Sequence, residues 1–293
     1  MIDPSDLARL EAAVERALVS GDECELTILG YGEVSLVIGW PFDAPVLACK
    51  RLPVFADAAS CSRYAAVVDD YVRALHEHGV DVLETEVHSC RTAGGGTTGF
   101  VVQPVVPSEM LGPNVLHAAT PDPQHPFLVA MSDATTGACS PTLGLDAQLS
   151  NWVWRDGRLR YLDVSTPFAW GDDGTLLLDL PVLVQSLPWV MRTPVRRFVL
   201  PNVIARYREP RAALLDFCGN LLKERLDAWV PAALVAANER AAPAITESEV
   251  HKYYASDARL WDVMLKVRRL DRIWQRKVRR RPYRFLLPGP ITR

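Results

Sequence analysis

Closely spaced cysteine pairs are absent from this chain of 293 residues, which contains no CxxC pair. Zinc sites and small disulfide frameworks depend on such pairs, so the pattern argues against both and fits a reducing compartment. The six cysteines are scattered along the chain: Cys24, Cys49, Cys61, Cys90, Cys139 and Cys218.

Long apolar runs are absent as well. No run approaches the roughly 20 residues that a membrane-spanning helix needs. The chain starts with MIDPSDLARLEAAVERAL, which carries aspartate and glutamate where a signal peptide would be basic and then apolar. We therefore expect a cytoplasmic protein without a membrane span.

An excess of positive charge is also lacking, since the formal net charge is -3 and the isoelectric point is near 6.1. This balance argues against a nucleic-acid binder as far as the whole molecule is concerned. No internal repeat or long low-complexity segment occurs. With 49% hydrophobic residues the chain can bury a large core, and its length predicts a two-lobed unit or two domains.

The first hundred residues combine helical and strand patterns. A helix is predicted at 3–19, because Pro4 can occupy its first turn and Gly21 follows as a stop. A second helix, closed by Gly79, carries its apolar residues on one face. The other patterns predict strands at 25–29, 33–38 and 46–51, the second helix at 56–78, and a pair of strands at 80–91 and 99–106 joined by the glycine-rich turn 93–99.

Helices dominate the predicted second half. Three prolines between 104 and 113 make 105–114 a poor strand or helix, so we predict a linker there. The apolar stretch 176–189 is interpreted as a buried helix flanked by loops. Further helices are predicted at 126–139, 198–207, 211–228 and 231–240.

The stretch 142–168 combines polar residues with a predicted hairpin. An Asp-Gly turn at 155–158 joins strands at 151–154 and 159–164. The turn places Asn151 and Asp163 so that both can converge on one metal ion, with Asp146 in the preceding loop. Asp146 and Asn151 also suit ordinary turns, but Asp163 stands in an apolar strand. Such a carboxylate needs a metal, a positive charge or several donors to stay ionised.

Two glycines and a lysine in the first half suit phosphate binding. Gly30 and Gly32 stand between two predicted strands, where free amide groups can meet phosphates, although glycines also serve ordinary hairpins. Lys50 alternates out of an apolar strand, where burial is costly unless the lysine meets an anion. A lysine at a strand end is also commonly solvated.

The order of these elements resembles the protein-kinase-like fold, in its aminoglycoside phosphotransferase and small-molecule kinase branch, over roughly residues 24–168. The resemblance implies an α+β, two-lobed protein. Residues 1–105 would form a lobe with a small antiparallel sheet, and residues 106–293 a mostly helical lobe.

The resemblance also implies roles for the residues at matching positions. Gly30 and Gly32 match the glycine-rich loop over the nucleotide, and Lys50 matches the lysine that holds the α- and β-phosphates of ATP. We place Gln103 among the nucleotide-binding residues as well.

Three further residues match the catalytic and metal-binding positions of this fold. Asp146 matches the catalytic aspartate that takes up the acceptor proton, and Asn151 and Asp163 match the Mg²⁺ ligands. The cofactors implied are therefore ATP and Mg²⁺, with a small-molecule hydroxyl as the acceptor.

The chain also departs from this family. Gly144 stands where the family usually has a histidine, and Val164-Ser165 follows Asp163 in place of Phe-Gly. The absence of an APE-like segment argues against a protein substrate. The helix at 56–78 offers Lys50 no well-placed glutamate, only Asp69 and Asp70, with Glu77 at its far end.

Three functions stay open on this basis. The first is an ATP- and Mg²⁺-dependent phosphotransferase acting on a small-molecule hydroxyl. The second is a pseudokinase that binds nucleotide or acts as a scaffold. The third is a nucleotidyl transferase that moves AMP on the same fold.

The last segment, 259–293, is rich in basic residues with apolar residues near helical spacing. One interpretation is a surface for an anionic substrate, anionic lipid headgroups or nucleic acid. The other is a helix that packs on the preceding helices and pairs its arginines with surface acids. We expect the cluster at 279–281 to be free for a phosphate-bearing partner.

Overall fold

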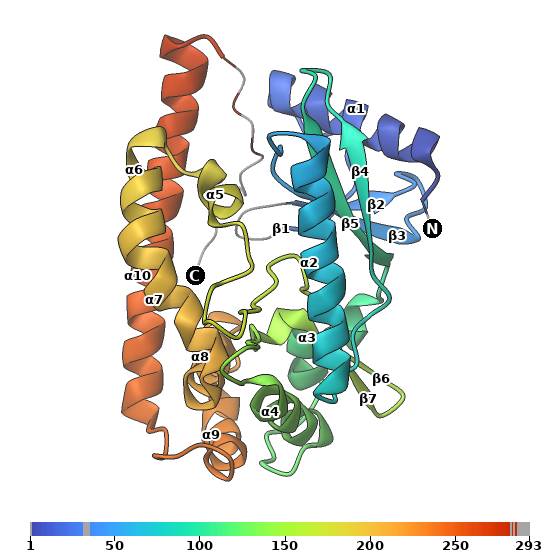
Figure 1. Cartoon of the computed structure of the whole chain (residues 1–293). Helices are drawn as coiled ribbons and strands as arrows, with labels where there is room; N and C mark the ends of the chain where they lie inside the picture. The colour runs from blue at the N-terminus through green and yellow to red at the C-terminus, as the bar shows by residue number, and fades with distance from the viewer. Residues whose placement is uncertain (1, 32–35, 282, 284, 286–293) are drawn as a thin grey trace.

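The computed structural model describes residues 2–31, 36–281, 283 and 285. A small antiparallel sheet is followed by a mostly helical remainder (Figure 1). The predicted α+β class is confirmed. The predicted division into two lobes at residue 105 stays a prediction, and the larger hydrophobic core runs from Leu52 to Val250 across that point.

Helix α1 (Pro4–Ser20) begins and ends as the sequence predicts. The Asp3 side chain accepts a hydrogen bond from the Ser5 amide, and Gly21 follows the helix with a φ of 79°. This left-handed conformation suits glycine and ends the helix. Leu10 and Val14 lie on the buried face of α1.

The sheet contains five antiparallel strands in the order β1-β2-β3-β5-β4. Their bounds are β1 (Ile28–Tyr31), β2 (Leu36–Trp40), β3 (Leu47–Arg51), β4 (Glu86–Arg91) and β5 (Thr97–Pro104). The first strand lies later than predicted, so Gly30 is inside β1. Residues 33–35 of the predicted second strand, and Gly32, lie outside the described residues.

The strand predicted at 80–91 is too long. Residues 80–85 connect α2 to β4 without joining the sheet, and the Leu83 amide bonds the Tyr161 carbonyl instead. Val80 and Val82 are buried in the larger core. Their apolar character therefore reflects packing in the larger core, and Val82 forms an isolated bridge with Tyr161 in place of pairing in the five-stranded sheet.

Two helices cover opposite faces of the sheet. Successive residues of a strand point to opposite faces: Val102 packs in the cluster that contains α1, and Val101 packs in the cluster that contains α2 (Ala58–Glu77). In Figure 1, α2 lies in front of the sheet and α1 lies beyond it.

The predicted linker at 105–114 is partly wrong. It contains a 3₁₀ turn, Ser108–Met110, and the start of α3 (Gly112–His117). Pro113 lies in the first turn of α3, where the missing amide hydrogen costs nothing. Helix α4 (Pro126–Ala138) follows at its predicted place.

The hairpin is confirmed, with β6 (Trp152–Arg155) paired to β7 (Arg158–Tyr161). Asp156 and Gly157 have φ values of 52° and 73°. Two successive positive φ values are typical of the tight turn that an Asp-Gly pair favours. The first strand starts one residue later than predicted and the second ends three residues earlier. Asn151 ends a 3₁₀ turn, Leu149–Asn151, just before β6.

The single buried helix predicted at 176–189 is wrong. The chain there forms α5 (Leu180–Leu183), a 3₁₀ turn (Val184–Ser186) and the start of α6 (Trp189–Pro194), and Pro188 caps α6. Trp189 is exposed. Pro181 and Pro188 both lie in this apolar stretch. Because proline breaks the interior of a helix, one continuous helix cannot form here.

The remaining helical elements are a π-helical turn (Val195–Val199), α7 (Leu200–Ala205), a 3₁₀ turn (Arg206–Arg208), α8 (Pro210–Lys223), a 3₁₀ turn (Asp227–Trp229), α9 (Val230–Asn238), α10 (Glu247–Ile273) and a second π-helical turn (Trp274–Val278). The helices predicted at 198–207, 211–228 and 231–240 are found at about those places, whereas α10 begins before the basic segment at 259–293. Helix α8 ends five residues earlier than predicted, and Arg225 just beyond it has a φ of 58°. Figure 1 shows α10 as one long helix. Within the described ranges, every helix is too short or too polar to cross a membrane.

Candidate functional site: a lysine–aspartate pair beside the hairpin

Lys50 lies in the middle of the sheet. It pairs with Val37 on β2 and with Val101 on β5, so all three side chains point to the face that α2 covers. Its Nζ lies 2.9 Å from both Oδ1 and Oδ2 of Asp163. The two side chains are 20% and 28% exposed, so the pair is partly shielded from water.

Asp163 stays ionised in this environment. Desolvation raises the pKa of its carboxyl group, but the Lys50 ammonium and hydrogen bonds from Lys50 and Ser165 outweigh this, and the pKa lies below its ordinary value. Ser165 donates to Oδ1 from its hydroxyl at 2.7 Å and from its amide at 3.1 Å. A positive charge and several donors thus accompany the carboxylate, as the sequence requires.

Asp146 and Asn151 are connected to the segment that carries Asp163. The Asn151 Nδ2 donates to the Asp146 carbonyl at 3.2 Å. The Leu162 amide donates to the Asn151 carbonyl at 2.8 Å. The structure therefore brings Asp146, Asn151, Asp163 and Lys50 into one region.

Helix α8 supports the loop that carries Asp146, a contribution that the sequence does not reveal. The buried Asn220 accepts a hydrogen bond from the Leu149 amide at 2.8 Å. Lys223 donates to the Gln148 Oε1 at 3.1 Å, and the Gln148 amide donates to the Asp146 Oδ1 at 3.2 Å. In the sequence, Asn220 and Lys223 are two of several polar residues on this helix, and nothing local marks them.

Gln103 lies at the same junction. Its Nε2 donates to the Thr85 hydroxyl and to the Leu162 carbonyl, both at 2.8 Å. Gln103 therefore links β5 to the residue directly before Asp163. Its amide nitrogen is engaged within the protein, and its predicted contact with a nucleotide stays a prediction.

The structure describes only one of the two glycines predicted for the nucleotide-binding loop. Gly30 is described, and a Cβ built on it would meet nothing within 4 Å. Packing therefore does not demand a glycine at position 30. Gly32 lies outside the described residues.

No carboxylate of α2 is seen at Lys50. Asp69 and Asp70 are exposed, and Asp70 pairs with Arg73 at 3.0 Å. Glu77 is exposed at the end of the helix. Lys50 instead contacts Asp163 directly.

Two tyrosines anchor α2 near the site. Tyr64 donates its hydroxyl to the Ser165 carbonyl, and Tyr71 donates to the Gly144 carbonyl at 2.9 Å. Burial, with the nearby Asp163 as a further cause, raises the pKa of Tyr64 well above its ordinary value, so the hydroxyl keeps the proton it donates. In the sequence both tyrosines resemble ordinary members of the apolar face.

Gly144 has a packing reason to be glycine. A Cβ at this position would lie 2.9 Å from the backbone carbon and oxygen of Tyr207. The Leu145 amide donates to the same Tyr207 carbonyl at 3.0 Å. The backbone before α8 therefore lies where a histidine side chain at 144 would begin.

The donor set at the site suits magnesium better than zinc. Within the ranges that the structure describes, no three His, Cys, Asp or Glu side chains form a metal-binding group. Asp163 offers an ionised carboxylate and Asn151 an amide oxygen. Mg²⁺ prefers such oxygen ligands and takes the rest from water and substrate phosphates.

Fold and site together define a mixed α+β protein with a lysine–aspartate pair between an antiparallel sheet and a helical remainder. The chain belongs to a family of unknown function, DUF6206, whose model matches residues 9–272. Among solved structures it is similar to WaaP in complex with acyl carrier protein, at 13% identity and a TM-score of 0.40, over 89% of this chain and 92% of that chain. No curated protein matches.

Proposed function

We propose that this protein is an ATP- and Mg²⁺-dependent phosphotransferase acting on a small-molecule hydroxyl. The contact between Lys50 and Asp163 carries the proposal, because it unites the lysine expected at the phosphates with the carboxylate expected at the metal. Asn151 and Asp146 lie on the loop joined to that carboxylate.

The roles of the binding residues follow from their chemistry. Lys50 would turn from Asp163 to the α- and β-phosphates, and Asp163 and the Asn151 amide oxygen would hold Mg²⁺. When bound, Mg²⁺ neutralises charge on the phosphate oxygens. The charge of Asp163 would thus be compensated by the Lys50 ammonium without nucleotide and by the metal ion when it is bound.

Asp146 would have one role in the reaction. The acceptor oxygen forms a bond to the γ-phosphorus as the bond to the β-phosphate oxygen breaks, and ADP leaves. Asp146 orients the acceptor hydroxyl and accepts its proton. The hydrogen bond from the Gln148 amide holds one oxygen of Asp146 in place for that task.

A second candidate function is nucleotide binding without turnover. Two observations favour it: the acidic residues of α2 are exposed while Lys50 pairs with Asp163, and the Tyr207 backbone leaves no space for a side chain at position 144. At both places the chain differs from the phosphotransferase pattern. In that pattern the residues at these places position catalytic groups.

The first test is thermal unfolding with and without Mg-ATP, on the wild type and on Asp163→Ala. A ligand specific to the folded state adds about 2.7 kcal/mol at a hundred times its Kd. We expect a magnesium-dependent shift in the wild type and none in Asp163→Ala. The exposed Asp172→Ala is the matched control and should keep the shift.

Product analysis then separates the candidates. Release of ADP with a phosphorylated acceptor supports phosphotransfer, and release of pyrophosphate supports AMP transfer. A shift without any product supports the binding module. No shift with ATP, GTP or ADP would contradict the nucleotide site itself.

A further inference from the structure

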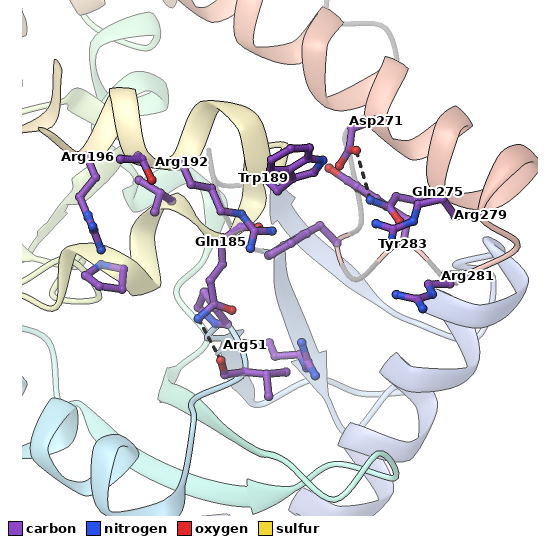
Figure 2. A pocket seen from close by; sticks show the side chains of 16 residues that line it. Arg51, Gln185, Trp189, Arg192, Arg196, Asp271, Gln275, Arg279, Arg281 and Tyr283 are labelled. Carbon is purple, nitrogen blue, oxygen red and sulfur yellow. Dashed lines mark hydrogen bonds between the residues drawn. The ribbon is translucent and has the colours of Figure 1, made fainter. Parts of the chain in front are cut away.

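A cavity of about 770 Å³ opens between β3, the segment around α5 and α6, and the end of the chain after α10 (Figure 2). None of Lys50, Asp146, Asn151 and Asp163 lines it. Its lining is rich in arginine and aromatic residues, and the members used below are Arg51, Val184, Trp189, Arg192, Arg196, Asp271, Arg279, Arg281 and Tyr283.

The arginines come from separate parts of the chain. Arg192 and Arg196 belong to α6 and the π-helical turn that follows it, whereas Arg279 and Arg281 follow the turn that continues α10. Figure 2 shows the two groups on opposite sides of the cavity, with Arg51 below them. Guanidinium groups therefore line two walls and the floor of the cavity.

Most of this charge lacks an acidic partner. Arg51 is the exception, because it forms two 2.7 Å hydrogen bonds to the buried Glu11. Arg192 donates to two backbone carbonyls at 2.9 Å. Among the described residues, no carboxylate forms a salt bridge with Arg192, Arg196, Arg279 or Arg281.

Only one carboxylate is among the described lining residues. Asp271 accepts a hydrogen bond from Gln275 at 3.3 Å. Besides Arg51, which Glu11 neutralises, four arginines thus share the cavity with one aspartate. Like charges held together are unfavourable, and an anion of two or more charges would relieve their repulsion.

We propose that this cavity binds a phosphate-bearing ligand of at least two negative charges. The planar guanidinium group matches phosphate oxygens in pairs, which a lysine cannot do. The volume lies within the range of ligand pockets, and Val184, Trp189 and Tyr283 add an apolar wall for the remainder of the ligand. The proposal does not rest on the proposed phosphotransfer.

The cavity also changes the expectation for the basic end of the chain. The sequence predicts that residues 279–281 stand free for a phosphate-bearing partner. Arg279 and Arg281 instead face a cavity shared with α6, and Arg280 is not among its lining residues. Specificity for the phosphate-bearing ligand would come from the arginines of both walls acting together.

Isothermal titration calorimetry with inorganic pyrophosphate, without nucleotide, tests the soluble form of the ligand. Flotation with vesicles of phosphatidylcholine, with and without phosphatidic acid, tests a lipid headgroup. We expect binding in at least one of the two assays. Binding in neither would overturn the proposal.

Charge-matched variants locate the binding. Arg196→Gln/Arg279→Gln removes one arginine from each wall and should weaken binding at least tenfold. Arg155→Gln/Arg158→Gln removes the same charge from the exposed hairpin and should leave binding unchanged. Equal losses in both variants would mean general electrostatic attraction and would overturn the proposal. Thermal unfolding checks that both variants fold, and Arg281→Gln alone repeats the test with a smaller change.

Asp163→Ala separates the two proposals. It should keep pyrophosphate or vesicle binding, because Asp163 does not line the cavity. If Lys50→Met abolishes pyrophosphate binding, the anion occupies the lysine–aspartate site and the cavity proposal is wrong. If Mg-ATP has no effect on the wild type but pyrophosphate binds, only the nucleotide site fails.

Discussion

Lys50 and Asp163 are 113 positions apart, and the lysine Nζ lies 2.9 Å from each oxygen of the carboxylate. The contact joins the central part of the sheet to the segment that follows the hairpin. Gln103 bridges the same two parts through the Leu162 carbonyl. Lys50, on a strand, and Asp163, just after the hairpin, are therefore in contact. The sequence predicts the phosphate site at the first of these residues and the metal site at the second.

The first prediction concerns this ion pair. Lys50→Met leaves Asp163 partly buried without its cation, and we expect a loss of about 1–3 kcal/mol in unfolding free energy at pH 7. Asp163 has a lowered pKa, so its contribution is present above the ordinary carboxyl pKa and is lost as the pH falls through the lowered value. Urea unfolding at pH 7 and pH 3 measures both effects.

A double-mutant cycle makes that prediction specific. Asp163→Asn in the Lys50→Met background should cost less than in the wild type, because the unpaired carboxylate is removed. Additive losses would contradict a coupled pair.

The second prediction concerns Glu11 and Arg51, which form a buried bidentate pair. Glu11 is 2% exposed, and both hydrogen bonds are 2.7 Å long. Glu11→Gln leaves a buried guanidinium without its anion, so we expect a loss of about 3 kcal/mol in chemical denaturation. Glu25→Gln breaks the exposed pair with Arg16 and should cost less than about 1 kcal/mol. Similar losses in the two variants would contradict the difference in burial.

The sequence predicts the local elements well where a residue type has one strong backbone preference. Pro4 and Gly21 mark α1, and the Asp-Gly pair at 156–157 marks the hairpin. It also predicts that Asp163 needs a positive charge or donors, because an ionised carboxylate in an apolar strand is otherwise too costly.

The missed features depend on contacts between distant segments. Glu11 lies on the apolar face of α1, and nothing local shows that Arg51 meets it there. Gly144 is glycine because the Tyr207 backbone returns against it, 63 positions later. The apolar stretch 176–189 has no period that reveals which residues are buried, so its broken course and the exposed Trp189 could not be predicted.

The third prediction tests the close approach at Gly144. An alanine Cβ would lie 2.9 Å from the Tyr207 backbone, which cannot move as a flexible side chain can. We expect Gly144→Ala to destabilise the fold by about 1–3 kcal/mol in thermal or urea unfolding. Gly30→Ala meets nothing within 4 Å and should change stability little. An unchanged Gly144→Ala would mean that the backbone of 206–208 moves freely.

The fourth prediction uses Gly30 as a probe of the proposed nucleotide site. Its surroundings are open in the protein alone, so a larger side chain is unfavourable only if a ligand lies close to the backbone. We expect Gly30→Val to weaken Mg-ATP binding at least tenfold in calorimetry while the unfolding temperature without ligand stays nearly unchanged. Gly137→Ala, on α4, has only ordinary contact distances and is the control for binding. Full affinity in Gly30→Val would place the nucleotide elsewhere.

The last prediction concerns Asp216 on α8, a carboxylate away from the lysine–aspartate pair. Burial, with Asp257 as a further cause, raises its pKa to about 6 despite a 2.7 Å hydrogen bond from Tyr253. The folded state therefore binds more protons than the unfolded state between pH 4 and 6, and the unfolding free energy falls as the pH rises through that range. We expect a fall on the order of 1–3 kcal/mol from this group.

Asp216→Asn removes the titrating group but keeps an oxygen that can accept from Tyr253. The difference in unfolding free energy between this variant and the wild type should therefore change between pH 4 and 6 and stay constant from pH 7 to 8. A parallel pH profile for Asp216→Asn and the wild type would mean that Asp216 is already ionised at pH 4, against the effect of its burial.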